Sequence, residues 1–255
     1  MSEQHLLEPF CFLGAKVHPW SSGQTLSEIN RRLNKNLFTQ HAVVNAAKVI
    51  NMHKDPMLRE AVNSCDIVNA DGMGVVWGAR ILGHDIQERV AGVDLFFRLL
   101  ELAVETKECV FFLGAEQNVL EKAVLNIRKE YPGLKIAGWH HGYFWDDEES
   151  VVRLISGSNA GLLFVAITSP KKEQFIHRWR EQLCVKFAMG VGGTFDIVAG
   201  MTNRAPKWMQ KFGLEWLYRV IQEPDRMWKR YLATNTLFVC YVIKEWVQMR
   251  LSVKK

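Results

Sequence analysis

Six clusters of polar residues and glycines could bind or transform a ligand, and each follows a segment that is predicted to be a strand. They are Asn45, Asp71-Gly72, Gly114, His141-Gly142-Tyr143, Ser169-Pro170-Lys171 and Gly192-Gly193-Thr194-Phe195-Asp196. In an open α/β sheet, ligands bind in the crevice outside the carboxyl ends of the strands. Glycine and aspartate also serve turns, so a single cluster would mean little. Six in succession predict one common ligand site at this edge of the sheet.

Asp71 is the leading candidate for chemistry among these residues. A carboxylate within hydrogen-bond reach is the simplest general base for removing a proton from an attacking hydroxyl group. The same residues also fit an Asp-Gly turn that leads into a helix over Gly74–Leu82. On the local sequence alone, both interpretations remain open.

Short strand-like runs alternate with helical patterns through the first 190 or so residues, which predicts a doubly wound, mainly parallel α/β sheet. Leu162–Ile167 is an unbroken apolar run, as is typical of a parallel strand covered on both faces. A capping box at Thr25–Glu28 is expected to open one helix, and Pro132-Gly133 to end another. The predicted strands are Phe10–Leu13, His41–Val44, Asp66–Asn69, Cys109–Leu113, Leu134–Trp139, Leu162–Ile167 and Val185–Met189.

The sequence changes character near residue 200. Strand signals stop, and two helical segments rich in aromatic residues follow, Lys207–Gln222 and Arg226–Met249. From Gly200 onward 11 lysines and arginines stand against 4 acidic residues, a balance of +7, whereas the preceding residues have 21 against 23. A basic, aromatic tail on a neutral body predicts contact with an anionic membrane surface. The alternative is that these helices pack on the body and their aromatic residues are core.

Composition sets the compartment that we expect. The chain has 255 residues, of which 48% are hydrophobic and 23% charged, as in ordinary globular proteins. Its five cysteines are scattered without a CxxC pair, which favours a reduced, cytoplasmic location. The start carries no signal-peptide pattern, and no apolar run reaches the roughly 18–20 residues of a spanning helix. We therefore expect a cytoplasmic protein, peripheral on the inner face of the cell membrane, with no nucleic-acid partner.

Longer motifs, which occur in order between about residues 38 and 232, carry a resemblance to a known family. They are Asn69–Val76, Glu88–Leu95, Tyr131-Pro132-Gly133, Gly142-Tyr143-Phe144, Ser169-Pro170-Lys171, Gly190–Gly193, Asn203–Trp208 and Gly213–Arg219. With these motifs the chain resembles the WecG/TagA/CpsF glycosyltransferase family. The resemblance implies an inverting, Rossmann-like enzyme that transfers a sugar from a UDP-sugar donor to a polyprenyl-diphosphate-linked glycan in cell-surface polysaccharide synthesis. It also implies a catalytic domain at 1–200 and a helical, membrane-associating appendage at 201–255.

The resemblance assigns expected roles to individual residues. Asp71 would be the general base, with Asn45, Arg219 and Arg226 also in the catalytic site. The candidate nucleotide-sugar contacts are Gly72, Arg89, Gly114, Tyr143, Pro170, Lys171, Lys172, Glu173, Gly192, Gly193 and Asp196. The candidate contacts of the acceptor diphosphate are Arg204, Arg219, Arg226 and Arg230. For Arg89 a surface ion pair is the simpler alternative, and for Asp196 a helix cap.

No metal cofactor is expected, because no Asp-x-Asp pair occurs and His140-His141 lacks further ligands at a suitable spacing. Backbone N–H groups, helix N-termini and basic side chains would then stabilise the leaving diphosphate. Two departures from the family pattern border the expected sugar site: Val43 stands where threonine is usual, and Lys172 where glutamine is usual. They leave the donor open, so the N-acetylmannosamine or uronic-acid donors of better-known members are not carried over.

Two other functions remain open on the sequence. Gly72–Gly78 has the form of a GxGxxxG dinucleotide loop, which favours an NAD-dependent oxidoreductase, although it does not lie in the first βα unit. A non-catalytic lipid- or sugar-binding homologue is the second alternative, prompted by Val43 and Lys172. The presence of Asp71 and of the basic tail argues against it.

Overall fold

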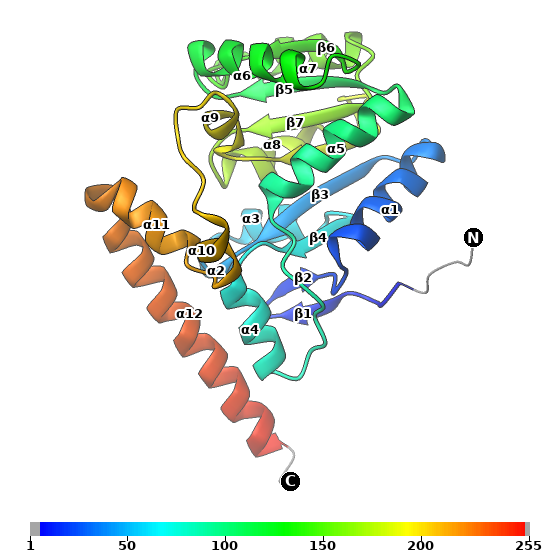
Figure 1. The fold of residues 1–255 in the computed structure, drawn as a ribbon. Coiled ribbons are helices and arrows are strands. Elements are labelled where there is room, and N and C mark those ends of the chain that lie inside the picture. The colour runs from blue at the N-terminus through cyan, green and yellow to red at the C-terminus, as the bar shows by residue number, and fades with distance from the viewer. Residues whose placement is uncertain (1–5, 253–255) are drawn as a thin grey trace.

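A six-stranded, all-parallel sheet lies at the centre of the computed structural model, in the strand order β4-β3-β8-β7-β5-β6 (Figure 1). The structure describes residues 6–252, except for the side chains of Arg226, Met227 and Arg230. The doubly wound α/β fold predicted from the sequence is confirmed. The strands of this sheet are β3 (Thr39–Val44), β4 (Ile67–Ala70), β5 (Cys109–Gly114), β6 (Lys135–His140), β7 (Leu162–Ala166) and β8 (Phe187–Gly190).

Helices cover both faces of the sheet, as the alternation in the sequence requires. On one face lie α1 (Ser22–Asn34), α5 (Gly92–Thr106), α6 (Gln117–Glu130) and the short α9 (Thr194–Val198). On the other lie α2 (Ala46–Lys54), α3 (Pro56–Asn63), α7 (Glu148–Gly157) and α8 (Lys171–Trp179). Helix α4 (Met73–Ile81) leaves the end of β4 and packs beside α2 and the amino-terminal hairpin.

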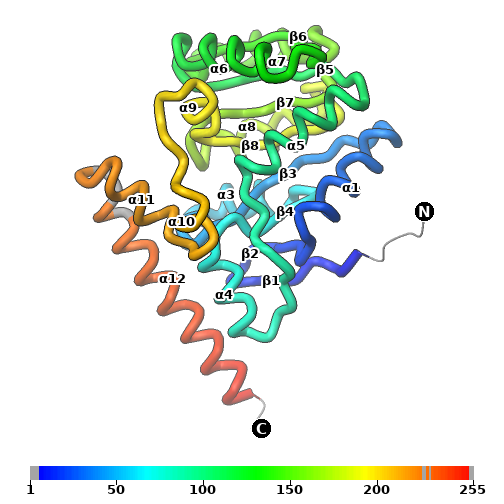
Figure 2. The backbone as a smooth tube through the Cα atoms, viewed as in Figure 1, coloured from blue at the N-terminus to red at the C-terminus, as the bar shows by residue number. Residues whose placement is uncertain are grey.

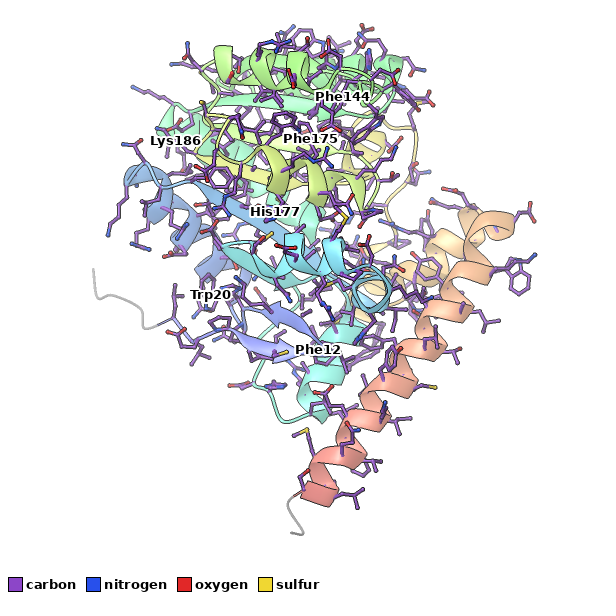
Figure 3. All side chains as sticks on the ribbon, turned by 180° about the vertical axis from the view of Figure 1, so that it is seen from behind. Phe12, Trp20, Phe144, Phe175, His177 and Lys186 are labelled. Carbon is purple, nitrogen blue, oxygen red and sulfur yellow. The ribbon has the colours of Figure 1, made fainter. Side chains whose placement is uncertain are left out.

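Aromatic side chains fix the helices to the sheet. Phe96 of α5 lies edge-on to Phe164 of β7, with ring centroids 4.9 Å apart, and Phe195 of α9 meets Phe112 of β5 at 5.6 Å. On the opposite face Phe175 of α8 contacts Phe144 at 5.4 Å, and both are labelled in Figure 3. Such ring pairs add to the burial of apolar area and hold the helix ends in fixed positions.

The amino-terminal strand belongs to a separate hairpin. β1 (Phe10–Phe12) pairs antiparallel with β2 (Ala15–Val17), a strand that was not predicted from the sequence. The turn residues Leu13 and Gly14 both have positive φ, 47° and 77°. Leucine is unusual in this conformation, so the two-residue turn lacks the Asn-Gly signature by which hairpins are recognised.

Helix α1 begins one turn earlier than predicted. Ser21 is its N-cap: the Ser21 hydroxyl accepts from the Gln24 N–H, and the Gln24 side chain accepts from the Ser21 N–H. The capping box expected at Thr25–Glu28 is therefore wrong. Thr25 lies inside the helix, buried, and its hydroxyl accepts a hydrogen bond from Asn69 Nδ2 at 3.1 Å.

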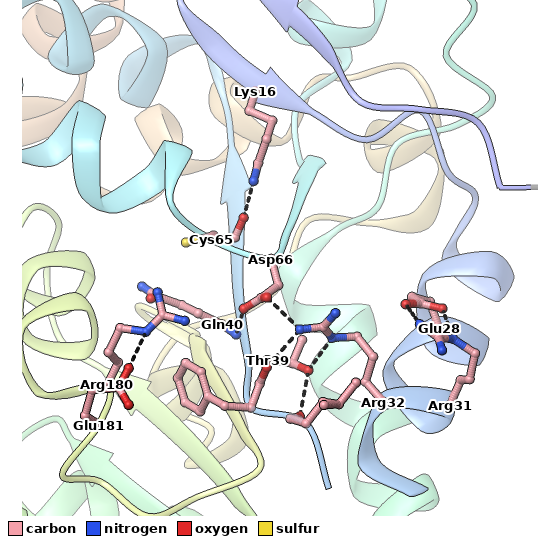
Figure 4. Close-up of polar contacts among 12 residues, drawn as sticks. Lys16, Glu28, Arg31, Arg32, Thr39, Gln40, Cys65, Asp66, Arg180 and Glu181 are labelled. Carbon is pink, nitrogen blue, oxygen red and sulfur yellow. Dashed lines mark hydrogen bonds and ion pairs between the residues drawn. The ribbon is translucent and has the colours of Figure 1, made fainter. Parts of the chain in front are cut away.

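The two edges of the sheet differ in how their polar groups are used. At the amino ends of β3 and β4, Arg32 pairs with Asp66 at 2.6 Å and donates to Thr39 Oγ1 at 2.7 Å (Figure 4). The second oxygen of Asp66 accepts from the Gln40 N–H at 2.8 Å. At the carboxyl ends, β3 leads into α2 on one face and its neighbour β8 into α9 on the other. This divergence is a topological switch point, where α/β sheets bind ligands.

Between residues 201 and 252 the tail forms three helices instead of the two predicted. They are α10 (Lys207–Lys211), α11 (Glu215–Gln222) and α12 (Pro224–Ser252). The predicted helix at Lys207–Gln222 is interrupted at Gly213, which has a φ of 69°, and a Cβ there would lie 2.7 Å from Met73 Cβ. The second helix begins before Arg226, because Pro224 suits a first helical turn.

Helix α12 runs along the body beside α4 (Figure 2). It nevertheless carries several exposed apolar side chains. Phe238 and Val242 are buried in the same cluster as Phe12 of β1, so the interpretation of the tail aromatics as core holds for this contact. Trp208 and Phe212, in contrast, are 59% and 63% exposed. Within residues 6–252, no helix combines the length and apolar character that crossing a bilayer requires. The division at residue 200 stays a prediction.

A buried ion-pair cluster ties α2 to α8. Glu173 Oε1 lies 2.7 Å from Lys48 Nζ and 2.9 Å from Lys172 Nζ. Burial alone would raise the pKa of Glu173, but the two ammonium groups outweigh it and lower the pKa to about 2. Lys172 also packs on Gly190, where a Cβ would lie 2.7 Å from the lysine chain. The cluster therefore holds the first turns of two helices beside the carboxyl end of β8.

We predict that Glu173→Gln lowers the free energy of unfolding by about 3 kcal/mol at pH 7, because it leaves two buried ammonium groups without a counter-charge. Lys172→Gln keeps the Lys48–Glu173 pair and should cost only about 1 kcal/mol. Urea unfolding measures both, and equal midpoints for the two variants would contradict the assignment. Since the pKa of Glu173 is lowered from 4.5, its stabilisation should be complete above that pH and lost as pH falls toward 2.

Candidate active site

Asp71 lies directly after β4, at the carboxyl edge of the sheet. Its N–H donates to the Val44 carbonyl at 2.8 Å, and its carboxylate accepts from the Gly92 N–H at 3.3 Å. Asn45 follows β3 and caps α2 by accepting from the Lys48 N–H at 2.9 Å. A Cβ on Gly72 would lie 3.4 Å from Asn45 Cβ. The structure thus brings Asn45, Asp71 and Gly72 together, as expected for strands that are neighbours.

The pKa of Asp71 is raised from 3.8 to about 6, and burial is the main cause. The carboxylate of Glu215 contributes in the same direction, whereas Arg89, Arg219 and the Gly92 N–H act to lower the pKa. A carboxyl group with a pKa near 6 is ionised at neutral pH and is a stronger base than an ordinary aspartate. The arrangement suits proton removal from a hydroxyl group.

Arginines surround this carboxylate in a network that joins the tail to the body. Arg89 pairs with Glu215 of α11. Arg204, which precedes α10, donates through Nη2 to Asp94 Oδ2 at 2.7 Å, and its Nε lies 3.8 Å from Glu215 Oε1. These contacts raise the pKa of Arg204 and lower the pKa of Asp94. The predicted residues Arg89, Arg204 and Asp71 therefore share one charged region.

Arg219 belongs to this region by its effect on the pKa of Asp71. Arg226 and Arg230 lie in α12, and their side chains are outside the described part of the structure. The roles given to these three arginines remain predictions.

Glu215, Asp94 and Lys48 are partners of the site that were not predicted from the sequence. Glu215 and Asp94 stand within the motifs Gly213–Arg219 and Glu88–Leu95, but the motif alone does not say what they contact. For Glu215 and Asp94, the charge could have indicated this role, because arginines that are partly buried in a folded chain require carboxylates close by.

A second group of predicted residues lies on the loops after β5 and β6. Gly114 has a φ of 118°, and a Cβ there would overlap the Ala166 carbonyl oxygen, so only glycine fits. A Cβ on Gly142 would lie 3.2 Å from the Gly114 Cα, so these two loops pack backbone to backbone. Tyr143 follows and is 68% exposed, with its hydroxyl 3.5 Å from Glu116. An exposed ring at this edge is open to stacking on a base.

The loop after β7 divides its residues between surface and interior. Pro170 precedes α8 after a cis Ser169–Pro170 bond, and Lys171 places Nζ 4.4 Å from the centroid of the Trp145 ring. Lys172 and Glu173 are instead buried in the cluster with Lys48. Their predicted contact with a nucleotide sugar is untested, and the structure gives them a structural partnership.

The loop after β8 supplies the last predicted residues. Gly192 has a φ of 55° and open space around it, and Gly193 is the N-cap of α9. The backbone carbonyl of Asp196 accepts from the N–H groups of Met201 and Thr202, at 2.8 and 3.2 Å. Asp196 therefore helps to turn the chain toward the tail. In the described residues, no three His, Cys, Asp or Glu side chains form a group that could hold a metal ion.

The glycines of Gly72–Gly78 serve packing. A Cβ on Gly78 would lie 2.9 Å from the Phe12 ring and 3.1 Å from Val242, and one on Gly74 would lie 3.7 Å from Phe238. These glycines let α4 approach β1 and α12 closely. This use accounts for the pattern without a dinucleotide, and the motif follows β4 instead of the first strand of the sheet.

Glycine-containing loops at the carboxyl edge of a doubly wound sheet are the means by which α/β enzymes hold nucleotides and phosphates, and this chain is of that class. Sequence comparison gives the family: the profile of the Glycosyl transferase WecG/TagA/CpsF family matches residues 10–252. The chain belongs to this family and is a glycosyltransferase.

Two curated relatives are similar over most of the chain. One, from Bacillus subtilis strain 168, is 39% identical over 192 residues, which cover 75% of this chain and 74% of the relative. The other, from Bacillus spizizenii strain W23, is 38% identical over 180 residues, 71% of this chain and 69% of the relative. Each is named N-acetylglucosaminyldiphosphoundecaprenol N-acetyl-beta-D-mannosaminyltransferase. The resemblance predicted from the motifs is confirmed.

We predict that the rate of glycosyl transfer falls as the pH drops through about 6, because Asp71 then becomes protonated and cannot accept a proton. Arg89→Leu should shift this acidic limb of the pH–rate profile to higher pH, since it removes a positive charge that favours the ionised carboxyl group of Asp71. The pH dependence of kcat/KM measures both effects. A limb near pH 4, or one that Arg89→Leu leaves in place, would contradict this assignment.

Proposed function

We propose that this chain transfers N-acetylmannosamine from UDP-N-acetylmannosamine to the N-acetylglucosamine of an undecaprenyl-diphosphate-linked acceptor. The transfer proceeds with inversion and without a metal ion. The observation that carries the proposal is Asp71, a carboxyl group with a pKa of about 6 beside Arg89 and the tail. The names of the two relatives supply the sugars. The donor nucleotide, UDP, is the one that the resemblance to the family implies.

The reaction is one displacement. The acceptor hydroxyl oxygen attacks the anomeric carbon, Asp71 takes the hydroxyl proton, and the bond from that carbon to the diphosphate oxygen breaks with its electron pair. UDP leaves with the additional negative charge. Attack from the side opposite the leaving group inverts the anomeric centre. We assign the orientation of the sugar hydroxyls to Asn45, which caps α2 beside Gly72.

In this proposal, arginine side chains stabilise the leaving diphosphate in place of a metal ion. Arg89 and Arg204 lie beside Asp71, and Arg219 is close enough to affect its pKa. Guanidinium groups bind phosphate oxygens in pairs and stay charged at every relevant pH.

The two departures from the family pattern occupy different settings. The γ-carbons of Val43 lie 3.6 and 3.8 Å from a Cβ position on Gly92, whose N–H binds Asp71, so Val43 borders the site. Lys172 is buried and paired with Glu173. Of the two departures, we therefore assign only Val43 to the surroundings of the donor sugar.

The membrane-facing surface that we propose consists of apolar side chains on α4, α10 and α11 and beside them. Its members are Trp77, Ile81, Trp208, Phe212 and Ile221, each at least 49% exposed. Basic residues accompany them on the tail, which carries 11 lysines and arginines from Gly200 onward. Apolar area and cations together favour binding to an anionic bilayer, with about 1 kcal/mol for each cation near the surface. This placement would bring the site to a lipid-linked acceptor.

Asp71→Asn is expected to keep UDP binding and to lower turnover at least about 100-fold, because the amide cannot act as a general base. Turnover is followed as UDP release with undecaprenyl-diphosphate-linked N-acetylglucosamine and a panel of UDP-sugars. Glu60→Gln, at an exposed acid on α3, also removes one negative charge and is the matched control. Near-normal turnover of Asp71→Asn would remove Asp71 from this role, and an absence of UDP release from every donor would favour the non-catalytic homologue.

The double variant Trp208→Glu/Phe212→Glu is expected to bind phosphatidylglycerol liposomes at least about tenfold more weakly, since it adds two negative charges to the apolar surface. Leu125→Glu, on the exposed side of α6, is the control and should bind as the wild type does. Co-sedimentation measures the bound fraction. Unchanged binding of the double variant would show that this surface does not meet the membrane.

A further inference from the structure

Glu215 lies between two arginines that the proposed function assigns to diphosphate binding. Its Oε2 pairs with Arg89 and its Oε1 lies 3.8 Å from Arg204 Nε. A carboxylate and a phosphate present similar pairs of oxygens to a guanidinium group. Glu215 therefore makes the type of contact that the oxygens of a diphosphate would make.

The charges of this region are already balanced. Among the side chains that the structure describes, Asp71, Asp94 and Glu215 stand against Arg89, Arg204 and Arg219. A diphosphate ester brings further negative charge. It gains full use of Arg89 and Arg204 only if a carboxylate leaves them, because repulsion between like charges opposes its entry.

The position and packing of α11 allow Glu215 to separate from Arg89 and Arg204. Glu215 is the first residue of this helix, and none of the eight residues of α11 is buried. Gly213, with its φ of 69°, joins α11 to α10. The described contacts of α11 with the rest of the chain include the Arg89 pair, the Trp216–Tyr231 ring contact at 6.0 Å and the bond from Gln222 Nε2 to the Asn203 carbonyl at 3.1 Å. Five of its residues are half-buried and three are exposed, and an element without a fully buried residue opens at lower cost than one anchored in the core.

We propose that Glu215 is an internal carboxylate that occupies the diphosphate subsite in the empty enzyme, and that the diphosphate of a substrate displaces it together with α11. The inference rests on the proposed function, which places a diphosphate here. It adds an autoinhibitory contact: α11 closes over Asp71 without substrate and opens when a diphosphate takes Arg89 and Arg204. A plain structural clamp would instead hold the arginines ready and help the ligand to bind.

The test compares inorganic pyrophosphate binding to the full chain and to Glu215→Gln by isothermal titration calorimetry. An internal competitor predicts that Glu215→Gln binds pyrophosphate about tenfold more tightly, within the usual range of coupling between two sites. Glu181→Gln, at an exposed acid beside Arg180, changes the net charge equally and should leave the affinity unchanged. Equal or weaker binding by Glu215→Gln would overturn the proposal, and weaker binding would point to a clamp.

Hydrogen exchange of the amides in 213–222 provides a second readout. Pyrophosphate should speed exchange in the wild type, whereas in Glu215→Gln exchange should already be fast without it. Slower or unchanged exchange in the wild type would contradict displacement of α11.

Titrations with UDP and with geranyl diphosphate identify which substrate displaces Glu215: the one whose affinity rises in Glu215→Gln. A rise with neither would overturn the proposal. None of these measurements requires sugar transfer, so a failure here leaves the proposed reaction standing. A failure of Asp71→Asn to lower turnover would conversely leave the Glu215 contact untouched.

Discussion

The ion pair between Arg89 and Glu215 is the contact on which the rest of the site depends, because it joins the two parts of the chain that surround Asp71. Arg89 comes from the loop that follows α4, and Glu215 from the tail. Their charges act on Asp71 in opposite directions, and burial raises its pKa. The protonation state of Asp71 is thus set jointly by the sheet, which buries it, and by the tail, which adjusts the charge beside it.

The topology of the sheet explains why these groups meet. Parallel strands end at one edge, and the chain turns to opposite faces of the sheet after β3 and after β8, which is the place where α/β sheets bind ligands. The buried cluster of Lys48, Glu173 and Lys172 fixes the helices that leave this edge. The amino edge is closed by Arg32 and Asp66. Buried ion pairs thus support the carboxyl edge of the sheet, whereas α11, which comes from the tail, contributes no buried residue.

Sequence patterns predicted the sheet, most of its strands and the residues at its carboxyl edge, since apolar runs and glycine clusters reflect local requirements. They did not reveal the hairpin partner β2, because Leu13 replaces the usual turn residue. They also did not reveal the break at Gly213, where the backbone has a φ of 69° and passes close to Met73. The pairings of Arg204 with Asp94 and of Arg89 with Glu215 span more than 100 residues of sequence. Such partners depend on the folded chain, and no local pattern encodes them.

Titration of the Asp71 carboxyl carbon by ¹³C NMR in the full chain tests most directly whether the tail and the sheet together determine the pKa of this carboxyl group. We expect a pKa of about 6 in the wild type and a lower value in Glu215→Gln, because a neighbouring negative charge is removed. If the pKa were near the ordinary 3.8 and the same in both proteins, neither burial by the sheet nor the charge of the tail would control the protonation of Asp71.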